Sequence, residues 1–98
     1  MAEAYTLTVW RVKPDQEEEF VRRWTDFADL ARRQGLTAPA RLLRDVEDPS
    51  RFVSFGPWKG LKEIAQWRSG PEFHQRVSRL QEVLDGFEPQ ALELVIER

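Results

Sequence analysis

Residues 51–58, RFVSFGPW, most constrain what this chain can fold into, because bulky residues occupy both faces of an alternating segment. Successive side chains of a β-strand point to opposite faces of its sheet, so alternation sorts them into two sets. Neither set is polar, and we therefore expect both faces of this strand to be covered. The sets are Phe52, Ser54, Gly56 and Trp58 on one face and Val53, Phe55 and Pro57 on the other.

The remaining periodic segments make this strand the third of four. Strand segments are rich in β-branched and aromatic residues, and helical segments repeat apolar residues every three or four positions. The order β-α-β-β-α-β predicts an α+β, ferredoxin-like fold: one antiparallel sheet with helices on one face, in a single domain of residues 1–98. The expected strands are 5–12, 38–46, 51–58 and 90–97, and the expected helical segments are 16–34, 60–67 and 71–85.

Several residues predict where these elements begin, end or bend. Asp15 is expected to cap the first helix, with Glu18 completing a capping box. Gly35 is expected to end that helix, and Gly86 the last one. The pair Gly56-Pro57 predicts a bulge or a sheet edge near the end of the third strand.

Composition excludes several classes of function. The 15 Lys and Arg are balanced by 17 Asp and Glu, for a net charge of −2, so we expect no nucleic-acid partner. There is no cysteine for disulfide or thiol chemistry. We find no signal peptide and no apolar run near the ~20 residues of a membrane span, and expect a cytoplasmic protein without a membrane partner.

Apolar residues on both faces of the sheet predict a partner. Helices would cover one face and leave the other as an apolar patch, which usually marks an interface. The simplest cover is a second copy of the same sheet, so we expect a homodimer.

Four features in order along the chain indicate a family. They are VKPDQEEEF after the first strand, ARLLRDVEDPSRFVSFGPW across the second and third strands, Trp67, and SGPEF. With these features, the chain resembles the antibiotic biosynthesis monooxygenase (ABM) domain family, whose members are dimeric α+β barrels of ferredoxin-like subunits. The resemblance extends over nearly the whole chain.

The resemblance implies an activity. Quinone-forming members oxidise a phenolic polyketide with O₂, without metal, flavin or haem, in a pocket between sheet and helices. The substrate loses a proton, passes an electron to O₂ and forms a peroxide that collapses to a quinone. We therefore expect no cofactor and a small aromatic ligand or substrate, which suits a chain with one histidine and no cysteine.

Two residues are carried over as catalytic candidates. Trp58 matches the family's tryptophan at the end of the third strand, and we expect its indole N–H to be free to donate to an oxygen intermediate. Ser54 stands where those enzymes have an asparagine, and their arginine falls near Ser78. The candidate substrate-binding residues are the aromatic Phe20, Trp24, Phe27, Phe52 and Trp67.

Haem-degrading relatives use an asparagine, a tryptophan and a histidine ligand at positions that here hold Thr8, Trp67 and Val77. The axial ligand is absent, and His74 lies on a different face of its helix, so we expect no haem site.

Structural roles compete with each of these functional ones. Trp58 and Trp67 could be packing residues, and Ser54 a small residue beside a pocket. Two functions stay open: a cofactor-independent monooxygenase, or a non-catalytic dimeric module that binds a small apolar ligand or only assembles.

Overall fold

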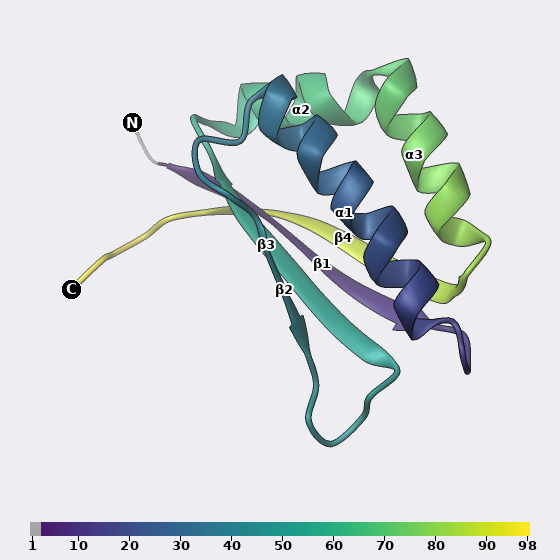
Figure 1. The fold of residues 1–98 in the computed structure, drawn as a ribbon. Coiled ribbons are helices and arrows are strands. Elements are labelled where there is room, and N and C mark those ends of the chain that lie inside the picture. The colour runs from purple at the N-terminus through teal and green to yellow at the C-terminus, as the bar shows by residue number, and fades with distance from the viewer. Residues whose placement is uncertain (1–2) are drawn as a thin grey trace.

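The computed structural model describes residues 3–98 as a four-stranded antiparallel sheet with its helices on one face (Figure 1). The sheet order is β2-β3-β1-β4, so β1 and β3 are central, and this is the predicted ferredoxin-like α+β fold. No helix in this part of the chain is long and apolar enough to cross a membrane. The elements are β1 (Ala4–Val12), α1 (Glu17–Gln34), β2 (Arg41–Arg44), β3 (Arg51–Trp58), α2 (Leu61–Ser69), α3 (Pro71–Gln81) and β4 (Leu84–Glu93).

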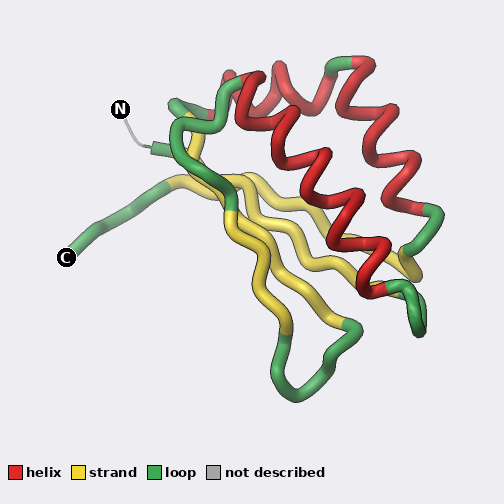
Figure 2. The backbone as a smooth tube through the Cα atoms, in the orientation of Figure 1, coloured by secondary structure: helices red, strands yellow, loops and turns green. Residues whose placement is uncertain are grey.

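The alternation of β3 produces the two faces that the sequence predicts. Phe52, Ser54, Gly56 and Trp58 are buried beneath the helices, while the residues between them are half-buried on the outer face. On β1, Thr8 pairs opposite Ser54 and therefore points to the same side. The helices α1, α2 and α3 all lie over one face of the sheet that these two central strands form with their neighbours (Figure 2).

The end of β3 shows why Gly56 is needed there. Strand β2 pairs only with Phe52–Phe55, so Gly56 and Pro57 lie beyond its end. The predicted open edge is not found there, because the Thr37 N–H donates to the Pro57 carbonyl and Leu36 forms a β-bridge with Trp58. The predicted bulge is wrong, because β3 stays in register with β1 throughout. The Leu36 side chain lies against Gly56: a Cβ atom on Gly56 would be 2.7 Å from Cδ2 of Leu36, so a larger residue there would need Leu36 to shift.

Gly35 ends α1 as expected, with a φ of 151° that favours glycine. The predicted cap at Asp15 is wrong: α1 begins at Glu17, and its N-cap residue, Gln16, makes no side-chain capping bond. Asp15 instead has a φ of 66° in the turn before the helix.

The last strand begins earlier than expected. Helix α3 ends at Gln81, and Leu84 already pairs with Val12, so Gly86 lies within β4 rather than at a helix end. Pro89 is tolerated inside this strand because β4 is an edge strand. An edge strand has a neighbour on one side only, so a proline without an N–H group disturbs the sheet less there than in a central strand. Strand β2 is also shorter than predicted, since Pro39 lies where the expected segment begins.

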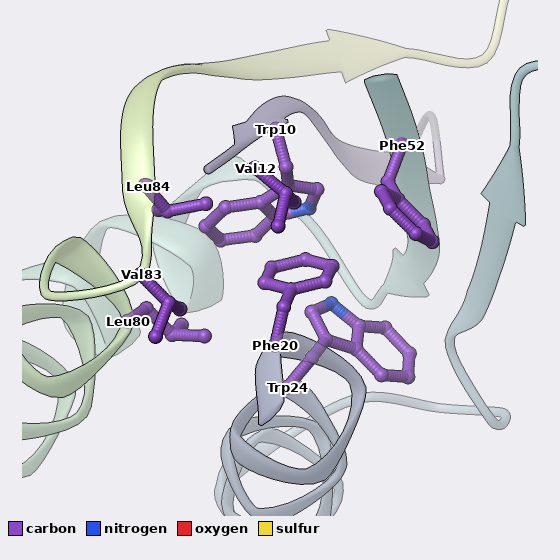
Figure 3. Packing of buried hydrophobic residues seen from close by; sticks show 8 residues of the cluster. All are labelled: Trp10, Val12, Phe20, Trp24, Phe52, Leu80, Val83 and Leu84. Atoms are coloured by element: carbon purple, nitrogen blue, oxygen red, sulfur yellow. The ribbon is translucent and has the colours of Figure 1, made fainter. Parts of the chain in front are cut away.

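Two hydrophobic clusters fill the space between sheet and helices. One surrounds Phe20 and Trp10 at one end of α1 (Figure 3), and the other surrounds Trp58 and Trp67 at its opposite end. Phe27, near the middle of α1, packs against both clusters.

The outer face of the sheet has no helix over it (Figure 1). Strand pairing places β1 and β3 side chains together there, with Leu43 of β2 and Leu92 of β4 beside them. Leu43 and Leu92 are 52% and 42% exposed. The face also carries Tyr5, Leu7, Val9, Val53, Phe55 and Pro57.

The turn between β2 and β3 predicts a loss of stability in acid. Backbone N–H groups of Glu47 and Asp48 donate to the Asp45 carboxylate and lower its pKa, and the hydroxyl and N–H of Ser50 do the same for Asp48. Both pKa values lie below the ordinary 3.8, so the stability that these carboxylates contribute is complete above that pH. This stability is lost as the pH falls through the lowered pKa values that Asp45 and Asp48 have in the folded state.

We therefore expect Asp48→Asn to flatten the acid side of a plot of melting temperature against pH. The exposed Asp29 of α1 provides the matched control, Asp29→Asn. An unchanged acid limb in Asp48→Asn would mean that the turn contributes nothing to acid sensitivity.

Candidate functional site

A small cavity lies between sheet and helices, where the two hydrophobic clusters meet. The residues that line it include Trp10 and Trp24 of the first cluster, Trp58 and Trp67 of the second, and Phe27, which packs against both. About 40 Å³ is open to the centre of a water molecule. One water needs roughly 10–15 Å³, so this space suits a few small molecules, and a flat aromatic ligand enters only when wall side chains move apart.

Aromatic rings make most of this wall. Trp67 contacts Trp58, Phe27 and Phe73 with ring centroids 5.8, 5.4 and 5.1 Å away. On the other side, Trp10 stacks on Phe87 of β4 at 5.7 Å. Such a wall can hold a planar aromatic molecule by stacking and edge contacts.

Two indole groups bind two hydroxyl groups across the central strands. Trp10 Nε1–H donates to Ser54 Oγ at 2.9 Å, and Trp58 Nε1–H donates to Thr6 Oγ1 at 3.0 Å. Trp10 lies on β1, and its partner Ser54 lies diagonally across from it on β3. Trp58 lies on β3, and its partner Thr6 lies diagonally across on β1. The expectation that the Trp58 N–H is free is therefore wrong, because Thr6 accepts it.

This arrangement leaves two hydroxyl protons beside the cavity. Ser54 and Thr6 both line it, and each uses its oxygen to accept an indole N–H. A hydroxyl can also donate one hydrogen bond, and neither donates to another residue within 3–98. Both can therefore donate to an oxygen atom of a ligand in the cavity, where burial strengthens such a bond.

Within the described part of the chain, Arg68 is the one charged residue on the cavity wall. One of its guanidinium N–H groups donates to the Gln90 backbone carbonyl at 2.9 Å. Partial burial is the only cause that lowers its pKa, and no carboxylate of residues 3–98 contributes. A guanidinium keeps its charge at neutral pH, so Arg68 brings a positive charge to an otherwise neutral wall.

The structure brings five of the seven candidate residues to the cavity: Trp58, Ser54, Trp24, Phe27 and Trp67. Phe20 and Phe52 lie in the packed core, 0% and 2% exposed, and do not line it. The Trp24 N–H is buried without a hydrogen-bond partner, and the nitrogen edge of its indole turns toward Phe20 (Figure 3).

Sequence reasoning missed Thr6, Trp10 and Arg68. The first two share the inward face of β1 with Thr8, so alternation placed them correctly without indicating a role. Arg68 had a signal: it lies four residues after Ile64, on the apolar side of α2, where a charged residue is unexpected.

Of the three positions that the resemblance assigns to haem-degrading relatives, two hold other residues here, Thr8 and Val77. Val77 lines the cavity, whereas His74 is exposed and does not. Within residues 3–98, no three His, Cys, Asp or Glu side chains lie close enough together to hold a metal ion.

Comparison with known proteins decides the family. The family model for antibiotic biosynthesis monooxygenases matches residues 4–79. The chain belongs to the antibiotic biosynthesis monooxygenase family. The match spans β1 through most of α3 and includes every cavity residue except those of β4. No curated protein matches the chain significantly.

Solved structures share the fold of this ABM domain. A Bordetella bronchiseptica protein assigned as an antibiotic biosynthesis monooxygenase superposes with a TM-score of 0.85 at 17% identity, over 98% of this chain and 100% of its own. SnoaB of Streptomyces nogalater, described as a cofactor-independent oxygenase, gives 0.83 at 17% identity, over 98% and 94%. A conserved protein of Methanosarcina mazei gives 0.81 at 18% identity, over 93% and 91%.

Proposed function

We propose that this family member is a cofactor-independent monooxygenase that oxidises an electron-rich phenol or hydroquinone, such as a phenolic polyketide, with O₂ to a quinone. The observation that carries the proposal is the aromatic cavity with the Ser54 and Thr6 hydroxyls beside it. Its rings suit a planar substrate, and its donors suit an oxygen that becomes negative during the reaction. Membership of the family and the likeness to SnoaB add support.

The chemistry for a phenol balances with O₂ as the only co-reactant. The phenol loses its proton, and the resulting anion passes one electron to O₂. The two radicals join through a new C–O bond at a ring carbon to give a peroxide. The peroxide takes up the proton that the phenol lost, and the ring carbon that carries it loses its hydrogen as the O–O bond breaks. Water leaves with one oxygen atom of O₂, and the other oxygen atom stays in the quinone.

Each polar group then has a role. Ser54 is a catalytic candidate that donates to the anionic oxygen directly. Trp58 acts through Thr6: its indole N–H fixes the threonine oxygen, so that the Thr6 hydroxyl proton points to the cavity. Trp24, Phe27 and Trp67 hold the substrate plane.

Oxygen consumption tests this proposal. With a simple naphthol or naphthohydroquinone, the protein should consume O₂ well above the rate of autoxidation, and mass spectrometry with labelled O₂ should find one labelled atom in the quinone formed from the naphthol. Consumption equal to the buffer control, over a range of such substrates, would contradict it.

A second function is supported by two features of the same cavity. It is small, at about 40 Å³, and among residues 3–98 no Asp, Glu or His lines it to move a proton. Both features also suit a non-catalytic module that binds a small apolar ligand. Saturable binding of a naphthol without oxygen consumption would favour this second function.

We also propose that two copies pair through the outer faces of their sheets. The half-exposed Leu43 and Leu92 there extend an apolar patch over all four strands. A second sheet would bury this patch and complete a dimeric α+β barrel.

Sedimentation at micromolar concentration should give about twice the mass of one chain, since an interface of this kind buries apolar area on both copies. Leu43→Lys places a charge in the proposed interface and should give monomers, whereas Lys62→Gln on α2 should not change the mass. A stable monomer of the parental protein would rule out the dimeric barrel.

A further inference from the structure

Two features hold Arg68 in the cavity wall: the packing of its helix on the sheet and a hydrogen bond to β4. Its helix, α2, packs Ile64 and Trp67 against the sheet, and both are almost fully buried. The Gln90 carbonyl of β4 then holds one N–H of the guanidinium at 2.9 Å. A guanidinium has five N–H donors, so most of them stay available to a ligand.

The charge of Arg68 is uncompensated within the cavity. The other lining residues are aromatic or aliphatic, apart from the hydroxyls of Thr6, Thr8 and Ser54. Five arginines within residues 3–98 form ion pairs, as Arg23 does with Glu19 and Arg51 with Asp45, whereas Arg68 does not. A positive charge beside an apolar space favours an anion over a neutral or cationic molecule of equal shape, because water screens it poorly there.

We infer that Arg68 is a specificity-determining residue that selects flat aromatic ligands carrying an anionic oxygen. This inference rests on the proposed function, since it assigns a substrate class to the same cavity. The aromatic wall binds the ring system, and the guanidinium binds the anionic oxygen by charge-assisted hydrogen bonds.

The charge of Arg68 also bears on how a phenol can lose its proton in this cavity. No carboxylate or imidazole of the residues that the structure describes lines the cavity to remove the phenol proton. A phenol held beside Arg68 becomes more acidic, because a positive neighbour stabilises the phenolate. Its proton can then pass to water, and the ionised form remains bound.

Three probes of equal shape test the charge preference without turnover. They are naphthoate, which is anionic at neutral pH, naphthalenemethanol, which is neutral, and naphthylmethylammonium, which is cationic. Isothermal titration should give naphthoate an affinity about tenfold above naphthalenemethanol, with the cation weakest. In Arg68→Gln the anion should lose this advantage and bind within about twofold of the neutral probe.

Lys62→Gln is the matched control, because Lys62 is an exposed cation of the same helix that does not line the cavity. It should keep the tenfold preference, and Arg68→Lys should keep part of it. Equal affinities for the three probes, no binding of any of them, or a preference unchanged in Arg68→Gln would overturn the inference. Failure of the proposed function is separate: it would leave the preference for naphthoate intact and abolish only oxygen consumption.

Discussion

Replacing Trp58 with alanine should destabilise the protein by about 3–5 kcal/mol, the usual cost of removing a large aromatic side chain from a core. Trp58 is 1% exposed and packs on Trp67. Its ring also lies close to Gly35: a Cβ atom on Gly35 would lie 3.1 Å from the Trp58 ring. Urea unfolding followed by circular dichroism measures the loss.

Trp58→Phe separates packing from positioning. Phenylalanine keeps most of the ring but cannot donate to Thr6, so stability should fall by only ~1 kcal/mol. Turnover should fall up to about tenfold, since Thr6 is no longer held. Thr6→Val removes the same hydrogen bond from the other side and should give a similar loss of turnover. If both variants oxidise substrate at the parental rate, Trp58 is a packing residue only.

Most of the fold could be predicted from local sequence patterns, because the spacing of apolar residues along a strand or helix reflects which side chains are buried. Strand alternation at 51–58 separated the inward and outward residues correctly, and the end of α1 at Gly35 was expected from the place of this glycine after an amphipathic segment. The start of β4 was missed because Leu84 has the same apolar character at a helix end as in a strand. Only its pairing with Val12 decides between the two, and pairing is not local.

The site was less predictable because it depends on which side chains meet. Trp10 and Ser54 are 44 residues apart, and nothing in either segment indicates that one donates to the other. The same holds for Trp58 and Thr6, whose contact changed the role expected for the indole. Register fixes such diagonal pairs, and register is set by the whole sheet.

The largest effect on turnover is expected at Ser54. Ser54→Ala removes a donor to the anionic oxygen, which typically costs about a hundredfold in rate. It should also destabilise the protein by about 1–3 kcal/mol, because the Trp10 N–H is then buried without an acceptor. Steady-state oxygen consumption and urea unfolding measure the two effects separately.

A double variant shows whether these two effects are independent. In Ser54→Ala with Trp10→Phe the Trp10 N–H that needed an acceptor is gone, so the stability loss should be smaller than the sum of the two single losses. Turnover should stay about a hundredfold low, because the hydroxyl is still missing. Ser54→Thr keeps a hydroxyl and should restore most of the rate. A parental rate in Ser54→Ala would instead make Ser54 a small residue that only leaves room beside the cavity, and the proposed monooxygenase would lose its direct donor.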